Sequence, residues 1–262
     1  DGPLSQAAGH DLNYLALTGV LHAIGPKELP TPPLNVVADM GGGAMFLAVG
    51  ILAAVIEARQ SGQGQVVDTA MTEGSAFLGM GAFGSLAAGT WKHERQANIL
   101  DGGAHFYRCY ETSDGKYVSI ASIEAKFYAI LLDKLGVDPA DIPEQMDRET
   151  WPEMAVKFEG LFAQKTRDEW CGIMEGTDIC FAPVLNFSEA LEHPHNKARG
   201  SFIDVGGVPQ PGPAPKFSRT PSRTKSSPPE MGANTADGLA SWGLSGDDIA
   251  ALTESKAVGW QG

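Results

Sequence analysis

The stretch from residue 34 to residue 77 reads LNVVADMGGGAMFLAVGILAAVIEARQSGQGQVVDTAMTEGSAF. Its apolar run, which follows three consecutive glycines, predicts a long helix from about Gly41 to Gln60. A glycine-rich turn comes next, and the β-rich stretch Gln65–Thr69 predicts a short strand before another helical stretch begins. Helix, strand and helix in this order predict an α/β organisation.

The same stretch contains the longest apolar segment of the chain, Met40–Ile56. It opens with the glycines and runs into Glu57 and Arg59, whereas a membrane span needs ~20 apolar residues. We therefore expect a buried helix and no membrane partner.

The chain has 262 residues and a formal net charge of −13. This acidic balance argues against a sequence-independent nucleic-acid binder, which needs basic surface. The three cysteines are an odd number without a CxxC pair, so neither a disulfide framework nor a zinc site is predicted. With no visible signal peptide, we expect a cytoplasmic location.

Outward from residues 34–77, apolar spacing predicts a helix that opens at His10 or Asp11 and ends at Gly25-Pro26. Beyond residue 101, FYRCYETSDGKYVSIAS predicts a β-hairpin that turns at residues 113–115. Helices are predicted at 127–135, at 151–164 and at 166–175, where Thr-x-x-Glu resembles a capping box. These elements predict a small α+β domain at 101–190. One amphipathic helix is predicted at 235–253.

Several familiar motifs are incomplete. His93-Glu94 has no second histidine four residues after the first, and His193-Pro194-His195 is typical of a solvated loop, so no metal is predicted. The glycine-rich stretches lack both the dinucleotide fingerprint and the Walker lysine, and no G-x-S-x-G elbow occurs.

Three ionisable residues remain as candidates: His10, Asp39 and Glu124. Each also has a purely structural explanation. His10 can start a helix, Asp39 can be an N-cap, and Glu124 can be a first-turn glutamate that the helix dipole favours.

These residue types and their neighbours are suited to proton-transfer chemistry. The glycines after Asp39, of which Gly41 and Gly42 are the first two, leave room for a ligand and offer backbone N–H groups to developing negative charge. A histidine and a carboxylate are suitable partners for moving a carbon-bound proton from one face to the other.

The chain resembles the α-methylacyl-CoA racemase family, within the family III CoA-transferase fold. The likeness runs from the first residue to about Phe202. It is carried by GHDLNYLALTGVL, PLNVVADMGGGAMFLAVGILAA, GQGQVVDTAMTEGSAFL, NILDGGAHFY, DGKYVSIASIEAKFY, WPEM, KTRDEWC, GTDICFAPVL and HNKARGSF.

The resemblance implies a Rossmann-like CoA-binding large domain, of which this chain holds the C-terminal part, and an interlocked homodimer. We assign residues 1–75 to that part and 76–100 to a linker. Residues 101–190 are the small domain, and 191–262 are a return segment that packs on the large domain.

The resemblance also assigns the site. His10 and Asp39 match the family's catalytic histidine and aspartate, and Glu124 matches an assisting carboxylate. The segment Gly9–Tyr14 matches the acyl-CoA contact, with the Asp11 backbone N–H as donor to the thioester oxygen. Its residues, with the two glycines, form the predicted substrate-binding set: Gly9, Asp11, Leu12, Asn13, Tyr14, Gly41 and Gly42. His105 and Lys126 stand where proline and glutamine are usual and are expected to add basic groups near the site.

The activity that the resemblance implies is racemisation of 2-methyl-branched acyl-CoA thioesters in fatty acid metabolism. His10 and Asp39 would be the two bases, and Glu124 would hydrogen-bond to His10. No cofactor is expected, because the thioester supplies the acidity and CoA is part of the substrate. Two alternatives stay open: a CoA-transferase with Asp39 as the nucleophile, and a non-catalytic fragment.

Overall fold

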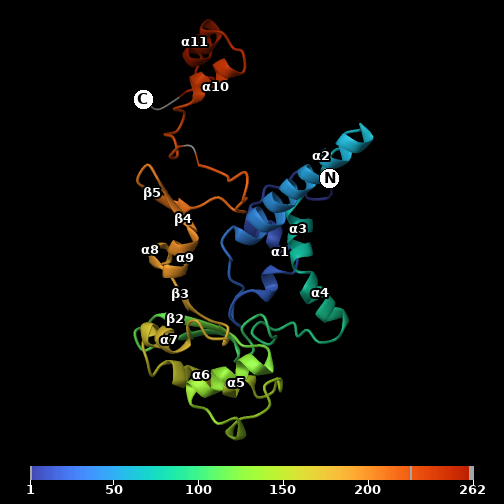
Figure 1. Ribbon diagram of the computed structural model, residues 1–262. Helices are drawn as coiled ribbons and strands as arrows, with labels where there is room; N and C mark the ends of the chain where they lie inside the picture. Colours follow the sequence, from blue (N-terminus) through green and yellow to red (C-terminus); the bar gives the residue numbers. More distant parts are fainter. Residues whose placement is uncertain (1, 225, 260–262) are drawn as a thin grey trace. The chain divides into compact units, whose positions relative to one another are not determined.

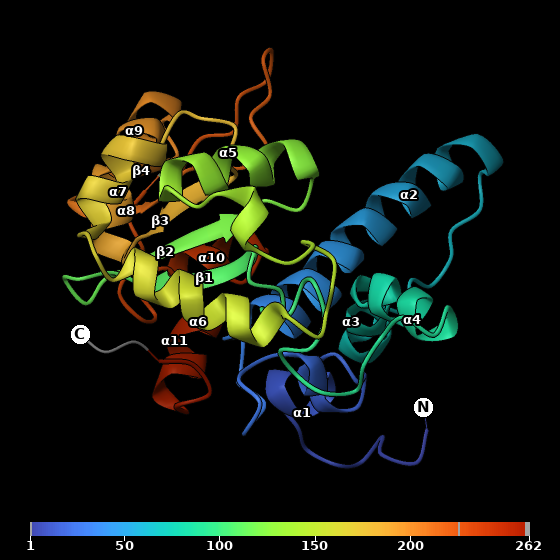
Figure 2. The same ribbon diagram turned by 90° about the horizontal axis from the view of Figure 1, so that it is seen from below.

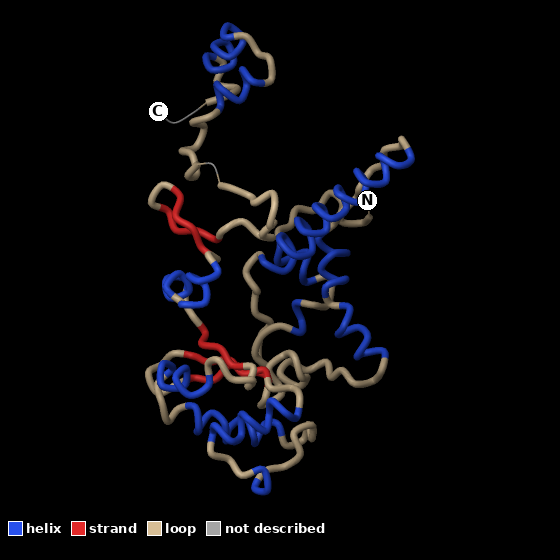
Figure 3. Tube along the Cα trace, viewed as in Figure 1, coloured by secondary structure: helices blue, strands red, loops and turns tan. Residues whose placement is uncertain are grey.

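The computed structural model describes residues 2–224 and 226–259 (Figure 1). The chain divides into two compact units, Asp1–Val184 and Leu185–Gly262. Helices and antiparallel strands both occur (Figure 3), which confirms the predicted mixture of helix and sheet. The predicted domain boundaries at 75, 100 and 190 stay predictions.

The first unit begins with a helical layer. Its elements are α1 (Asp11–Ala16), the 3₁₀ turn η1 (Leu21–Ala23), the π-helix η2 (Val36–Met45), α2 (Phe46–Ser61), α3 (Met71–Leu78) and α4 (Met80–Ala87). The helix predicted from His10 to Gly25 is therefore too long. It breaks because Gly19 adopts a left-handed φ of 81° and the Thr18 hydroxyl accepts the Val20 N–H.

The strand predicted at Gln65–Thr69 is wrong. These residues form a connection without regular secondary structure between α2 and α3, and among the described residues no strand pairs with them. A β-strand needs a neighbouring strand with which to exchange backbone hydrogen bonds, so a β-rich sequence alone does not make one.

The helices η2 and α2 form one continuous helix, Val36–Ser61. By length and composition alone this helix is apolar enough to cross a membrane, although a single helix of this kind only weakly indicates a span. Our prediction of a buried helix is wrong for the described residues, because no residue of α2 is buried. Figures 1 and 2 show α2 extending beyond α1 and α3. Its apolar residues include Leu47, Val49, Leu52 and Ile56, all exposed.

The glycines of η2 pack against α3. A Cβ added at Gly41 would lie 3.0 Å from the Leu78 side chain, and one at Gly42 would lie 2.5 Å from Ser75 Oγ. In the opposite direction, a Cβ at Gly74 would lie 1.9 Å from the Gly42 carbonyl oxygen. The two helices are thus in backbone contact, which only glycine permits.

The small sheet of the first unit is antiparallel, in the order β1-β2-β3. Its strands are β1 (Tyr107–Glu111), β2 (Tyr117–Ala121) and β3 (Phe181–Val184). β1 pairs with β2 from Tyr107 opposite Ala121 to Glu111 opposite Tyr117, which confirms the hairpin. Gly115 in the turn has a φ of 70°, a conformation that glycine adopts at no steric cost.

Helices cover one face of this sheet. They are α5 (Ala125–Leu135), α6 (Trp151–Phe162) and α7 (Arg167–Met174), with the 3₁₀ turn η3 (Pro139–Asp141) between the first two. Figure 2 shows α5 and α6 across the same face. The predicted capping box is confirmed: Thr166 Oγ1 accepts the Glu169 N–H, and Glu169 Oε2 accepts the Thr166 N–H at 2.8 Å.

The core between sheet and helices is rich in aromatic rings, among them Phe106, Tyr110, Phe158 and Phe162. His105 lies in it, 1% exposed, with its Nε2 hydrogen-bonded to the Tyr128 hydroxyl at 2.7 Å and its Nδ1 without a partner. Burial, helped by the positive charge of Arg108, lowers the pKa of His105 from 6.5 to about 4.

We predict that His105 makes the chain sensitive to acid. The unfolded histidine takes up a proton as pH falls below 6.5, while the folded one stays neutral until about pH 4. The free energy of unfolding should therefore fall across this window, by at most about 3 kcal/mol. Urea unfolding at pH 7 and pH 4.5 measures the fall.

The matched variants are His105→Gln, which keeps a polar group for Tyr128, and His93→Gln, which changes an exposed histidine. The first should flatten the pH dependence and the second should leave it unchanged. Equal slopes for the wild type and His105→Gln would contradict the prediction.

Arg95 joins two distant loops of the first unit. Its guanidinium donates from Nε to the Pro26 carbonyl at 2.7 Å, from Nη1 to the His22 carbonyl at 3.2 Å and from Nη2 to the Lys27 carbonyl at 2.6 Å. The chain after α4 is thereby attached to η1 and to the loop that follows it.

The second unit contains α8 (Phe187–Glu192), α9 (Pro194–Arg199), the hairpin of β4 (Phe202–Val205) and β5 (Val208–Pro211), α10 (Thr235–Ser241) and α11 (Gly246–Glu254). The single helix predicted at 235–253 is wrong, because Gly243 has a left-handed φ of 95° and Ser245 starts a new helix by accepting the Asp248 N–H.

Candidate functional site

His10 is the N-cap residue of α1, as one of the structural explanations predicted. Its extended backbone (φ −127°, ψ 178°) starts the helix, and its N–H donates to Asn13 Oδ1 at 3.1 Å. Its side chain is exposed. The Tyr14 ring lies beside Gly9, the residue before His10, since a Cβ at Gly9 would lie 3.0 Å from this ring. The segment Gly9–Tyr14 is therefore one compact turn with an accessible imidazole.

Asp39 lies in the first turn of η2, and the N-cap residue is Asn35. The interpretation of Asp39 as an N-cap is therefore wrong: η2 begins at Val36 and is a π-helix, as the bond from the Met40 N–H to the Asn35 carbonyl shows. The half-buried Asp39 carboxylate accepts a hydrogen bond from Asn35 Nδ2 at 3.3 Å. Asn35 is a neighbour that the sequence pattern did not single out.

The Asp11 carboxylate connects these two segments. Asp11 Oδ1 accepts the backbone N–H of Asp39 at 2.7 Å, across 28 residues of sequence. Because Asp11 follows His10 directly, this bond places the His10 turn beside the first turn of η2. From the sequence only the Asp11 backbone was expected to contact substrate. The role of its side chain has no local signal, because its partner lies 28 residues away.

The glycines after Asp39 have a packing role in the structure. Gly42 is buried against Ser75 and Gly74, and Gly41 lies against Leu78 and the Val36 carbonyl. The space that their missing side chains leave is filled by α3. Their role in substrate binding stays a prediction.

Glu124 lies apart from the other two candidates. It is the exposed N-cap residue of α5, with an extended backbone (φ −72°, ψ 138°). Within residues 2–224 and 226–259, no hydrogen bond joins it to His10 or to Asp39. The predicted bond to His10 is not formed within the chain, and a bond across a dimer stays a prediction.

The two unusual basic residues differ in their surroundings. His105 adds no positive charge near neutral pH, because burial in the small-domain core lowers its pKa to about 4. Lys126 is exposed at the start of α5, with its Nζ 4.5 Å from the centroid of the Phe127 ring. The expectation of an added positive charge is therefore wrong for His105, and a place for Lys126 near the site stays a prediction.

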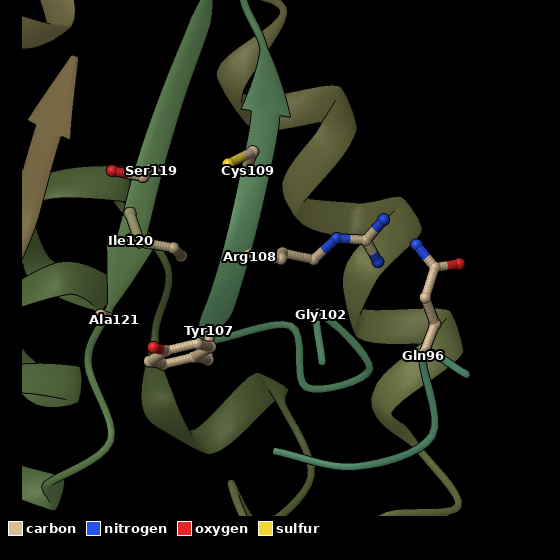
Figure 4. Close-up of a pocket in the computed structure, with 8 residues that line it drawn as sticks. All are labelled: Gln96, Gly102, Tyr107, Arg108, Cys109, Ser119, Ile120 and Ala121. Carbon is tan, nitrogen blue, oxygen red and sulfur yellow. The ribbon is translucent and has the colours of Figure 1, made fainter. Parts of the chain in front are cut away.

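A hollow of about 470 Å³ lies along β1 and β2, away from these candidates. Figure 4 shows the Arg108 guanidinium reaching toward the Gln96 side chain at its edge, with Cys109 and Ser119 on the adjacent strands. None of the predicted site residues lines it. Across the described part of the chain, no group of three or more His, Cys, Asp or Glu side chains is placed to hold a metal ion. All three cysteines are free.

Comparison with known proteins matches residues 1–235 to CoA-transferase family III. The chain is 47% identical over 260 residues to the alpha-methylacyl-CoA racemase of Mus musculus and 42% identical over 264 residues to that of Homo sapiens. Each alignment covers 98% of this chain and 68% of the relative.

A solved structure of a CaiB/BaiF family protein from Brucella suis superposes with a TM-score of 0.74 at 22% identity. The superposition covers 92% of this chain and 65% of that one. It supports the predicted fold class.

Proposed function

The chain belongs to CoA-transferase family III, and from this membership and its likeness to the racemases we propose that it is an isomerase that racemises 2-methylacyl-CoA thioesters. The geometric observation that carries the proposal is the bond from the Asp39 N–H to Asp11 Oδ1, because it brings the segments of both proposed bases together. The exposed His10 imidazole and the half-buried Asp39 carboxylate are both available for proton transfer.

The proposed reaction is a proton transfer through an enolate. The neutral imidazole of His10 removes the α-proton, and the electron pair of the C–H bond moves onto the thioester oxygen. A protonated Asp39 then gives a proton to the opposite face of the planar intermediate. In the reverse direction the two residues exchange roles.

The enolate oxygen needs hydrogen-bond donors. The Asp11 N–H belongs to the first turn of α1, where amide groups have no acceptor within the helix, so it is the proposed donor. The rest of the turn, Gly9 and Leu12–Tyr14, would contact the acyl-CoA. Glu124 would orient the His10 imidazole by a hydrogen bond made in the assembled enzyme.

The proposal also covers the cofactor requirement, the oligomeric state and the cellular location of the enzyme. CoA is part of the substrate, and the thioester makes the α-proton acidic, so the chemistry requires no further cofactor. A homodimer is supported by the exposed apolar residues of α2, which a second copy would cover. We place the enzyme in the cytoplasm and in the metabolism of branched fatty acids.

The test is exchange of the α-proton in D₂O, followed by NMR with each configuration of a 2-methylacyl-CoA. Deuterium should enter the α-position, and His10→Ala should slow this for one configuration by about 100-fold or more, because general bases contribute ~10²–10⁴. The other configuration should be affected less.

The matched control is His195→Ala, which removes an exposed histidine of the second unit. It should leave exchange unchanged. Absence of exchange in the wild-type chain would refute the proposal, and an equal loss for both configurations in His10→Ala would argue against two separate bases.

The family description itself favours a second candidate, a CoA-transferase in which Asp39 attacks the thioester carbonyl and releases CoA as its thiolate. The product would be an acyl anhydride on Asp39, which hydroxylamine would convert to a hydroxamate. Inactivation by hydroxylamine in the presence of acyl-CoA would support this candidate. Full activity after such treatment would favour the racemase.

A further inference from the structure

The carboxyl side chain of Asp11 is buried. The residue is 9% exposed, its Oδ1 accepts the Asp39 N–H at 2.7 Å, and its Oδ2 is buried without a partner in the structure. A buried carboxylate oxygen without a hydrogen bond is unfavourable for folding. The Oδ2 atom therefore carries a stability cost that a side chain without a second polar atom would avoid.

The hydrogen bond that Asp11 makes satisfies a group that η2 cannot satisfy. The bond from the Met40 N–H to the Asn35 carbonyl is the first of the helix, so the Asp39 N–H has no acceptor within η2. The N-cap residue Asn35 makes no side-chain cap bond, and its Nδ2 donates to the Asp39 carboxylate. The missing acceptor comes from a separate helix.

The position of this acceptor in the sequence connects the backbones of the two proposed bases. Asp11 is the residue after His10, and it holds the backbone of Asp39 itself. We propose that the Asp11 carboxylate is a positioning residue, which fixes the Asp39 main chain relative to His10 so that both bases address one α-carbon. This inference rests on the proposed function as far as the roles of His10 and Asp39 are concerned.

The proposal predicts a specific pattern of kinetics. Asp11→Ala keeps the backbone N–H proposed for the thioester oxygen but removes the acceptor for the Asp39 N–H. We expect kcat for α-proton exchange to fall about 10- to 100-fold, the range that misplacement of a reacting group produces, with KM changed less than about threefold. Asp11→Asn keeps one acceptor oxygen and should recover much of the lost kcat.

A second measurement does not depend on activity. In the wild type, the Asp39 amide should exchange slowly with D₂O because Asp11 binds it. Asp11→Ala should speed this exchange at least about tenfold, and Asp11→Asn should give an intermediate rate. The matched control is Asp138→Ala, because Asp138 Oδ1 also accepts a backbone N–H, that of Ala140 at 2.9 Å, in a turn of the small domain. Asp138→Ala should change neither kcat nor the exchange rate of the Asp39 amide.

The outcomes separate the two proposals. If the wild type exchanges no α-proton, the proposed function fails, while amide exchange still tests the contact. Unchanged exchange of the Asp39 amide in Asp11→Ala overturns the positioning role, and so does a raised KM with unchanged kcat, which indicates substrate binding. If Asp11→Ala does not fold, Asp11→Leu, which is closer in size to aspartate but has no acceptor oxygen, decides: a lower kcat at constant KM with faster exchange of the Asp39 amide supports the role, and wild-type values of both overturn it.

Discussion

Asp39→Asn is expected to lower the turnover of a 2-methylacyl-CoA by at least about 100-fold, the lower end of what a general acid or base contributes. The asparagine amide can neither take nor return the α-proton. The fold should tolerate the change, because the side-chain oxygen can still accept from Asn35 Nδ2 and the backbone N–H can still donate to Asp11. The free energy of unfolding should stay within about 1 kcal/mol of the wild type.

Steady-state racemisation and urea unfolding of the same preparation measure both quantities. Asp68→Asn is a suitable control, because it removes an exposed carboxylate from the connection between α2 and α3. Near wild-type turnover in Asp39→Asn would rule out its role as a base. A loss of several kcal/mol in stability would instead indicate that Asp39 is kept for structural reasons.

Gly74→Ala is expected to have the largest effect on stability, a loss of about 3 kcal/mol or more. The new Cβ would lie 1.9 Å from the Gly42 carbonyl oxygen and 2.6 Å from its carbonyl carbon. Both are backbone atoms, so no change of rotamer relieves the clash and the two helices must separate. Because η2 carries Asp39, turnover should fall as well.

Gly84→Ala is the matched control, because Gly84 lies in the neighbouring helix α4 and a Cβ there meets nothing within 4 Å. It should stabilise the chain by ~0.5–1 kcal/mol through helix propensity. Urea unfolding of both variants gives the comparison. Equal stability of Gly74→Ala and the wild type would show that η2 and α3 can separate without loss.

The parts of the fold that the sequence predicted well depend on local signals. The turn at Gly115 needs a left-handed φ, and the capping box of α7 needs only Thr166 and Glu169, three residues apart. His10 was recognisable as a helix start for the same reason. Such signals act between near neighbours in the chain.

The errors arose where distant segments decide the local structure. Asp39 was expected at a helix end, but η2 starts earlier and its free N–H is bound by Asp11 from another helix. The glycines were expected to make room for a ligand, whereas α3 fills that room. His105 was expected to be a base, and the surrounding aromatic core lowers its pKa.

The contact of Arg95 with η1 and the loop after it limits which substitutions can accumulate in this chain. All three acceptors are main-chain carbonyls, those of His22, Pro26 and Lys27. The residues at these three positions can be substituted without loss of the contact, because every residue carries the same main-chain carbonyl. Only arginine presents several N–H groups in a rigid fork, so lysine at position 95 could not replace it. Selection on this contact therefore acts on the side chain of Arg95 alone. The side chains of the three residues that accept its hydrogen bonds are free to diverge.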